Sequence, residues 1–269
     1  MFSTILHGFS GAERVTLTKI TAGKDDPDTG FAIATYNIHS CLGTDGAFRP
    51  DRVAQAIRAL DADVIGLQEV GWALRGPSGF DQFAFLERET GYTVIPGLVR
   101  HHANAHFGNA ILSRHPVESV APLDLSLPYH SPRGGIDARI RVKGRSVRLI
   151  NVHLGLIPLE RRIQIRRIGL RLLDGWRGPA LVCGDLNHWR RTSPAMQRLH
   201  RLLPGGVTGQ TYPSALPTMM FDRILATGDL HLENHQVIRT EGTRVASDHL
   251  PLMAWFRFEG ADVLSEDAA

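Results

Sequence analysis

The segment Ala180–Asn187 (ALVCGDLN) consists of four apolar residues, a glycine, and then two polar residues separated by a leucine. A short apolar run that ends at a glycine predicts a buried β-strand. Asp185 and Asn187 are two positions apart, so in an extended chain their side chains point to the same side. We therefore predict a buried strand that carries an acidic and an amide side chain at its end.

Similar apolar runs lie on both sides of this segment. They predict strands over residues 31–36, 64–67, 109–113, 147–154, 221–226 and 250–256. Apolar residues at helical spacing predict one helix that begins at Pro50 and Asp51, and a second over about residues 159–173. Strands mixed with helices favour an α/β architecture over an all-β one. Two packed sheets with helices outside would accommodate this number of strands.

The two ends of the chain differ in composition from the part between them. We expect residues 1–28 to form a flexible leader, residues 29–258 to form one domain, and residues 259–269 to form an acidic, frayed tail. No apolar run approaches the roughly 18 residues that a membrane-spanning helix needs. The N-terminal stretch has no secretory signal pattern, and two cysteines are too few for a disulfide framework. We therefore expect a cytoplasmic protein.

Polar residues follow or interrupt the predicted strands in six places. They are Asn37, Glu69, His153, Asp185 with Asn187, Asp222, and Asp248 with His249. Strand ends form the ligand-binding crevice of open α/β sheets, and a carboxylate near an apolar core costs free energy unless it holds a metal or a partner. Any one of these residues alone fits a cap, a turn or a salt bridge. Six such segments in one chain indicate a functional site.

These residue types suit the hydrolysis of a phosphoester. Mg²⁺ binds through one or two carboxylates and keeps several waters, and a histidine can take a proton from water near neutral pH. The remaining donors would stabilise the negatively charged transition state. The net charge of +3, carried mostly by arginine, is compatible with a phosphate-bearing substrate. The arginines of the predicted helix over residues 159–173 equally fit a solvated helix face.

Seven short segments occur in a recognisable order. They are TYNIH (35–39), LQEV (67–70), GNAILSR (108–114), NVHL (151–154), GDLN (184–187), FDRI (221–224) and SDHLP (247–251). In these segments the chain resembles the endonuclease/exonuclease/phosphatase superfamily, over about residues 31–258. The resemblance implies a four-layered α/β sandwich in which two mixed sheets pack face to face between helices. It also implies a Mg²⁺-dependent phosphoric ester hydrolase, with Mn²⁺ as the alternative ion.

The resemblance also implies roles for the matched residues. Glu69 would be the principal metal ligand, with Asn37 and Asp248 nearby. His249 would be the base that activates water, and Asp222 would orient it.

Four further positions are matched to the substrate. Asp185 and Asn187 would position the nucleophile and bind phosphate oxygens, and His153 would stabilise the transition state or assist the leaving group. Arg133, in the segment PRGG (132–135), and Asn109 would contact the substrate.

The substrate is less well defined than the reaction. His39 and His153 stand where apurinic endonucleases resemble one another in having an acidic residue and a tyrosine, which argues against a base-excision enzyme. We favour a nuclease that acts as a monomer. The alternative is a hydrolase of phospholipid headgroups or small phosphoesters, similar to sphingomyelinases or inositol phosphatases. An inactive binding module is a minor alternative. His101, His102 and His106 lack metal-site spacing and are expected to lie in an ordinary loop.

Overall fold

The computed structural model describes residues 30–71, 79–102, 105–190 and 193–259. The expected leader and all but the first residue of the expected tail therefore lie outside the described residues. No helix in the described part is long and apolar enough to cross a membrane.

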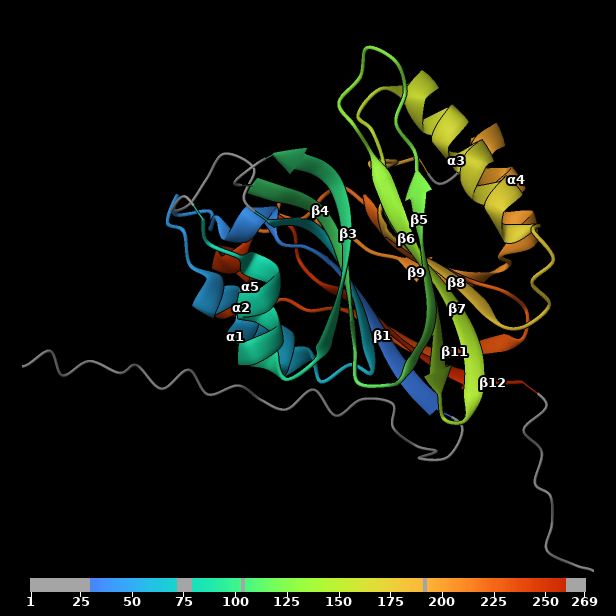
Figure 1. Cartoon of the computed structure of the whole chain (residues 1–269), viewed down its shortest axis with the longest axis horizontal. Coiled ribbons are helices and arrows are strands. Elements are labelled where there is room, and N and C mark those ends of the chain that lie inside the picture. Colours follow the sequence, from blue (N-terminus) through green and yellow to red (C-terminus); the bar gives the residue numbers. More distant parts are fainter. Residues whose placement is uncertain (1–29, 72–78, 103–104, 191–192, 260–269) are drawn as a thin grey trace, which may run out of the picture.

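Two six-stranded mixed sheets form the centre of the molecule (Figure 1). The first sheet has the order β11 (Leu230–Val237), β12 (Leu252–Phe258), β1 (Gly30–Asn37), β2 (Val64–Gly71), β4 (Ala105–Ser113) and β3 (Thr93–His102). The second sheet has the order β5 (Val117–Asp124), β6 (Gly134–Val142), β7 (Arg145–His153), β8 (Ala180–Asp185), β10 (Asp222–Ala226) and β9 (Gly205–Thr208). In each sheet one central pair is parallel, β1 with β2 and β7 with β8, and the other pairs are antiparallel.

Helices cover the outer face of each sheet, which confirms the predicted four layers. On the first sheet lie α1 (Pro50–Leu60), α2 (Gln82–Thr90) and the short α5 (Glu241–Ala246), and on the second lie α3 (Pro158–Leu172) and α4 (Pro194–Leu202) (Figure 1). A short 3₁₀ helix, His39–Cys41, follows β1. Three apolar clusters fill the spaces between adjacent layers, so each sheet is covered on both faces.

The strands predicted from apolar runs are all present, most of them longer than predicted. One expectation about a loop is wrong. His101 and His102 belong to β3 and His106 to β4, and His101 pairs with His106 in the antiparallel ladder. Backbone pairing continues into this segment although the sequence contains no apolar run there.

Two local backbone features shape the end of the molecule where the polar residues gather. Gly184 has φ +140°, and a Cβ at this position would clash with the carbonyl oxygen of Val152, so only glycine fits directly before Asp185. Glu69 has φ +56° and lies where the pairing of β2 with β4 shifts register between Leu67 and Val70. A bulge of this kind re-aims a side chain, and here that side chain is the Glu69 carboxylate.

Candidate active site

The ends of neighbouring strands bring the polar residues of both sheets together. In the second sheet, Asp185 pairs with His153 on one side and with Asp222 on the other. In the first sheet, Asn37 at the end of β1 pairs with Gln68, the residue before Glu69. Strand register alone therefore places three of these residues side by side on one sheet and two more at the end of the other.

Asn37 joins the two sheets. Its amide nitrogen donates to Glu69 Oε1 at 3.1 Å and to Asp185 Oδ2 at 3.2 Å, and its amide oxygen accepts from the backbone N–H of His39 at 3.0 Å. The backbone carbonyl of Asn37 accepts from the Ser247 hydroxyl at 2.7 Å, which fixes the segment that carries Asp248 and His249. One buried asparagine thus contacts three parts of the site.

His249 and Asp222 form a buried ion pair. His249 Nδ1 lies 2.9 Å from Asp222 Oδ2, which also accepts from the Thr211 hydroxyl at 2.5 Å. The rings of Tyr212 and Phe221 pack against the imidazole with centroids 4.9 and 6.3 Å away. Burial opposes the charged imidazole, but the carboxylates of Asp222, Asp185 and Asp248 outweigh it and raise the pKa of His249 to about 10. The ring is therefore held in place and surrounded by negative charge.

Asp185 lies between two histidines. Its Oδ2 is 3.7 Å from His249 Nε2 and 3.6 Å from His153 Nε2, and its Oδ1 accepts from the backbone N–H of Asn187 at 2.8 Å. Burial raises the pKa of Asp185 to about 6, and the Asp222 carboxylate adds to this rise while His249 opposes it. Asp185 is the central acidic group of the cluster.

His153 and Arg133 form a second pair on the far side of Asp185. Arg133 Nη1 lies 3.1 Å from a ring nitrogen of His153. Burial, together with the positive charge of Arg133 and of His249, keeps the pKa of His153 well below its usual range. At neutral pH His153 is therefore a neutral ring that can accept a hydrogen bond from the guanidinium.

The remaining predicted residues occupy less central positions. Asn187 has φ +49°, and its amide donates to the Leu154 carbonyl at 2.9 Å. Asp248 is 34% exposed, and its Oδ1 lies 3.7 Å from His39 Nδ1. Asn109 is buried, and its amide donates to the Gly134 carbonyl at 2.8 Å. This bond fixes the backbone next to Arg133. Its contact with substrate stays a prediction.

Gln68 and Asn151 form a buried amide pair that is not among the predicted site residues. Asn151, on β7, donates to the backbone carbonyls of Leu67 and Ala110 at 2.9 and 2.8 Å and accepts from Gln68 Nε2 at 2.7 Å. These bonds cross from the second sheet to the first at the bulge that carries Glu69. Asn151 is part of the NVHL motif (151–154), but its partner is 83 residues away in sequence, so no local pattern indicates the pair.

The donor set fits one hard divalent cation. Glu69 is partly exposed and receives a hydrogen bond from Asn37, and no Lys, Arg or His among the described residues forms an ion pair with it. A carboxylate in such surroundings keeps oxygen lone pairs for a metal. No group of three or more His, Cys, Asp or Glu within the described ranges is arranged to hold a metal ion.

Comparison with known proteins identifies the family. A sequence model of the Endonuclease/Exonuclease/phosphatase family matches residues 34–249. Uncharacterized protein YbhP of Escherichia coli (strain K12) is 28% identical over 244 residues, which cover 83% of this chain and 95% of that protein.

Solved structures share the fold. An endonuclease/exonuclease/phosphatase from Beutenbergia cavernae DSM 12333 superposes with a TM-score of 0.69 at 24% identity, covering 87% of this chain and 72% of that one. A mannosyl-6-phosphatase of Bacteroides thetaiotaomicron VPI-5482 superposes with a TM-score of 0.66 at 18% identity, covering 85% of this chain and 100% of that one. The family match covers all the candidate site residues from Asn37 to His249, and the chain belongs to the endonuclease/exonuclease/phosphatase family.

Proposed function

We propose that this protein is a divalent-metal-dependent phosphodiesterase in which His249 activates the attacking water. The observation that carries the proposal is the continuous chain of side-chain contacts from Asp222 through His249 and Asp185 to Asn37 and Glu69. It joins a buried acid–histidine pair to a partly exposed carboxylate that has no cationic partner among the described residues.

The side chains divide the reaction between them. Asp222 holds His249 through Nδ1, so that Nε2 faces Asp185 and is available to a water beside it. A neutral His249 accepts the proton of that water as it attacks phosphorus. Asp185 and Asn187 orient the water and one phosphate oxygen, and the Arg133 guanidinium, held against His153, stabilises the negative charge of the transition state.

The metal would be held by Glu69, with Asp248 at the edge of the same cluster. When bound, it supplies Lewis-acid stabilisation of charge on the phosphate oxygens. Mg²⁺ is the ion that we propose, and Mn²⁺, which prefers similar oxygen ligands, should replace it.

Nucleic acid is the first substrate class to test, because the protein carries a net positive charge and the site suits a phosphodiester. A second candidate, the hydrolysis of phospholipid headgroups, is favoured by apolar side chains near the site. Leu156 is 69% exposed a few residues after His153, and Trp189 is 48% exposed two residues after Asn187. Leu216 is 69% exposed on the segment whose Ser214 donates its backbone N–H to the Asp248 carbonyl.

The hydrolysis of bis(4-nitrophenyl) phosphate tests the reaction without depending on the natural substrate. We expect turnover with Mg²⁺, loss of turnover with EDTA, and a fall of about 100- to 10,000-fold in His249→Gln. Glu69→Gln should need a much higher Mg²⁺ concentration for half-maximal rate. Arg49→Ala, at an exposed ion pair on α1, is the matched control and should leave the rate unchanged. Turnover that survives EDTA, or that Glu69→Gln and His249→Gln leave intact, would reject the proposal.

The same preparation then decides between the substrates. Plasmid and single-stranded DNA, RNA, and mixed phospholipid vesicles are each incubated with the wild type and with His249→Gln. Cleavage of nucleic acid that depends on His249 supports the first candidate. Release of headgroup from lipid with nucleic acid left intact supports the second.

A further inference from the structure

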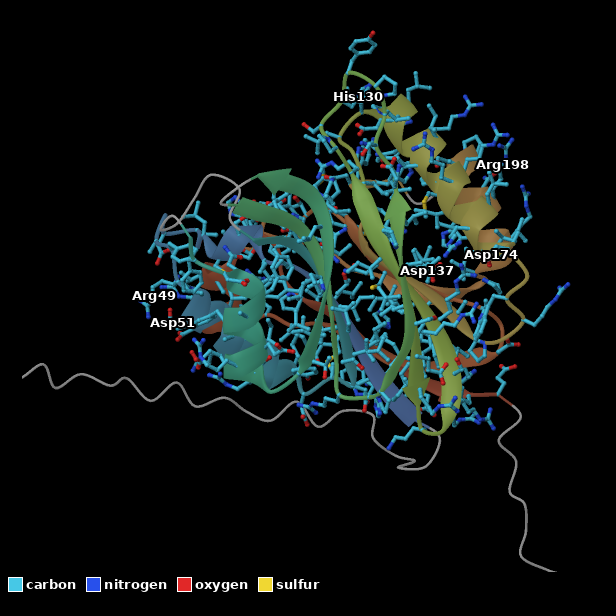
Figure 2. All side chains as sticks on the ribbon, viewed as in Figure 1. Arg49, Asp51, His130, Asp137, Asp174 and Arg198 are labelled. Carbon is cyan, nitrogen blue, oxygen red and sulfur yellow. The ribbon has the colours of Figure 1, made fainter. Side chains whose placement is uncertain are left out.

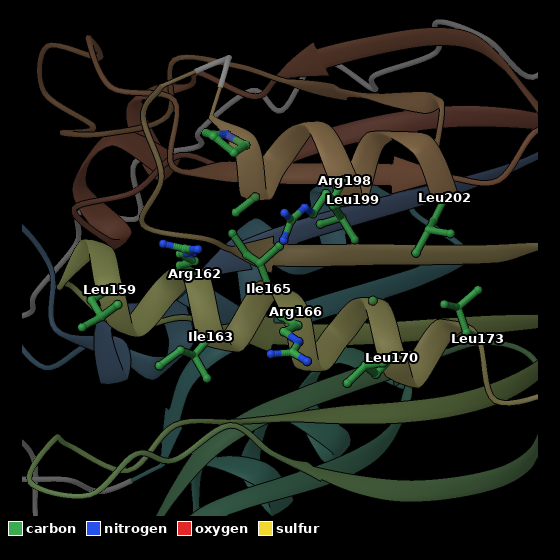
Figure 3. A pocket seen from close by; sticks show the side chains of 13 residues that line it. Leu159, Arg162, Ile163, Ile165, Arg166, Leu170, Leu173, Arg198, Leu199 and Leu202 are labelled. Atoms are coloured by element: carbon green, nitrogen blue, oxygen red, sulfur yellow. The ribbon is translucent and has the colours of Figure 1, made fainter.

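A groove runs along the surface between α3 and α4 (Figure 3). It consists of two adjoining hollows of about 550 and 480 Å³, which share Arg162, Ile165, Pro194 and Ala195. The hollows therefore form one continuous feature along the two helices.

One part of the groove is apolar and open to solvent. Leu159, Leu170 and Leu173 are 64%, 61% and 65% exposed. Ile165 and Leu199 form the buried floor beneath them. Leucines grouped along one groove are unfavourable in contact with water. Exposed apolar patches of this kind mark sites that bind another apolar surface.

Three arginines that line the groove have no acidic partner among the described residues. None of Arg162, Arg166 and Arg198 forms an ion pair within the described part of the chain, and no Asp or Glu lines either hollow. On α3 the exposed stripe contains both residue types: Leu159, Arg162, Arg166 and Leu170 follow one another at intervals of three or four residues and so lie on one helix face. The other α3 arginines have structural roles. Arg167 donates to the carbonyl of Ser126, and Arg171 pairs with Asp137.

The second hollow concentrates positive charge near the start of α3. Arg161 is buried, donates from Nη1 to the carbonyls of Gly155 and Leu156, and has no hydrogen-bond partner for Nε among the described residues. Burial and the positive charges of Arg223, Arg161 and Arg190 lower the pKa of His188 to about 4. This end of the groove therefore suits an anionic headgroup, whereas the leucines suit acyl chains.

An exposed mixture of arginine and leucine matches the boundary layer of a membrane better than it matches nucleic acid. Arginine can bind a headgroup phosphate while its alkyl stem lies against apolar surface, and apolar side chains enter the acyl boundary. A groove that binds a nucleic acid backbone does so mainly through positive charge, and three exposed leucines would add nothing to that contact. Charge complementarity and exposed apolar surface thus point to the same occupant.

We propose that the α3–α4 groove docks the protein on a bilayer that contains anionic phospholipids. Ile157, 49% exposed, and Leu156, 69% exposed, lie in the chain between the start of α3 and His153. Docking through this face would therefore place the candidate active site at the edge of the membrane. The proposal does not depend on the proposed reaction, because docking needs neither turnover nor a metal ion.

Sedimentation with vesicles tests the proposal directly, with the full chain in EDTA. We expect the wild type to bind phosphatidylcholine vesicles that contain phosphatidylglycerol and not to bind vesicles of phosphatidylcholine alone. The double variant Arg162→Glu/Arg166→Glu should bind about tenfold or more weakly, since each cation at an anionic surface contributes to affinity. Leu170→Ser/Leu173→Ser keeps every charge and should also bind clearly more weakly.

The matched control is Arg58→Glu/Arg88→Glu, which makes the same charge change at exposed positions on α1 and α2 and should bind more tightly than the groove charge variant. All variants should retain the wild-type circular dichroism spectrum and the wild-type rate on bis(4-nitrophenyl) phosphate.

Four results would overturn the proposal. They are a wild type that does not bind anionic vesicles, equal weakening in the control, unchanged binding in the leucine variant, and self-association through this face without lipid. Displacement of the vesicles by a DNA oligonucleotide together with unchanged binding in the leucine variant would identify a nucleic acid surface instead.

Discussion

His249 owes its protonation behaviour to three carboxylates around one buried ring. Asp222 contacts Nδ1 directly, Asp185 faces Nε2, and Asp248 precedes the histidine in the chain. Together they outweigh burial and raise the pKa to about 10. A base must be deprotonated to act, so the rate should rise with pH and its acidic limb should lie above the ordinary histidine pKa of about 6.5.

Asp222→Asn tests this relation. Removing the closest carboxylate lowers the pKa of His249, so the acidic limb of kcat/KM should move to lower pH. The maximal rate should fall because the amide no longer stabilises the imidazolium that forms. The measurement is the pH–rate profile of the wild type and the variant on bis(4-nitrophenyl) phosphate. A limb that stays in place, or a wild-type rate that falls as pH rises through this range, would assign His249 another role.

The sequence predicts the residues of the site better than it predicts the residues that hold them in place. Motif order and strand-end positions identify Asn37, Glu69, Asp185 and His249, and the structure brings their side chains into contact or near contact. Thr211, which donates to Asp222, is 11 residues away in a segment without periodicity. Such contacts depend on tertiary packing, which a single sequence does not display.

The variant Asn151→Ala tests whether Asn151 positions the Glu69 carboxylate. The variant removes the side-chain donor of two backbone carbonyls, whereas the Gln68 amide keeps its bonds to Thr35 and Gly66. Each buried group left unsatisfied costs about 1–3 kcal/mol. We expect a lower free energy of unfolding in urea and a higher Mg²⁺ concentration for half-maximal rate, because the bulge that aims Glu69 loses its anchor. Asn234→Ala, at an exposed position on β11, should change neither. An unaltered Mg²⁺ dependence in Asn151→Ala would limit the residue to stability.

At the element scale, a buried ionic cluster fixes the end of α3 to the second sheet. Arg148, 2% exposed, pairs with Asp137 through Nε and Nη2 at 2.9 and 2.6 Å and with Asp174 at 2.7 Å. It also donates to the carbonyl of Arg171 in the last turn of the helix. Figure 2 shows Asp137 and Asp174 on the side of the second sheet, apart from Arg49 and Asp51 beside α1.

Arg148→Ala should therefore destabilise the fold strongly. The variant leaves Asp137 paired only with the partly exposed Arg171, and breaking a buried pair costs about 3–5 kcal/mol. The exposed pair of Arg49 with Asp51 provides the comparison, and Arg49→Ala should cost less than about 1 kcal/mol. Urea denaturation followed by circular dichroism measures both. Similar small losses in the two variants would show that the Arg148 cluster is not a stabilising anchor.

Several elements were not predicted because their sequences lack a continuous apolar run or a clear helical period. β5 has no buried residue, and β3 contains Pro96 and Gly97, so neither strand has a continuous apolar run. α2 and α4 have nine residues each, too few for a clear helical period. The central strands are covered on both faces and contain apolar runs, which can be recognised in the sequence.

At the scale of the whole molecule, the site exists only because two separate sheets end at the same place. Asn37 and Glu69 come from the first sheet, Asp185 and Asp222 come from the second, and Asn37 is bonded across the boundary. Neither sheet alone would carry both the carboxylate suited to a metal and the acid–histidine pair. We propose that water is directed at phosphorus at this junction.

Hydrolysis of bis(4-nitrophenyl) phosphate in water labelled with oxygen-18 tests this proposal. Mg²⁺ is present, and the products are analysed by mass spectrometry. Attack on phosphorus puts the label in 4-nitrophenyl phosphate and none in 4-nitrophenol, and Glu69→Gln and Asp222→Asn should each suppress the labelled product. Label in the nitrophenol, or labelled phosphate formed equally well by either variant, would contradict a shared hydrolytic site at the junction of the sheets.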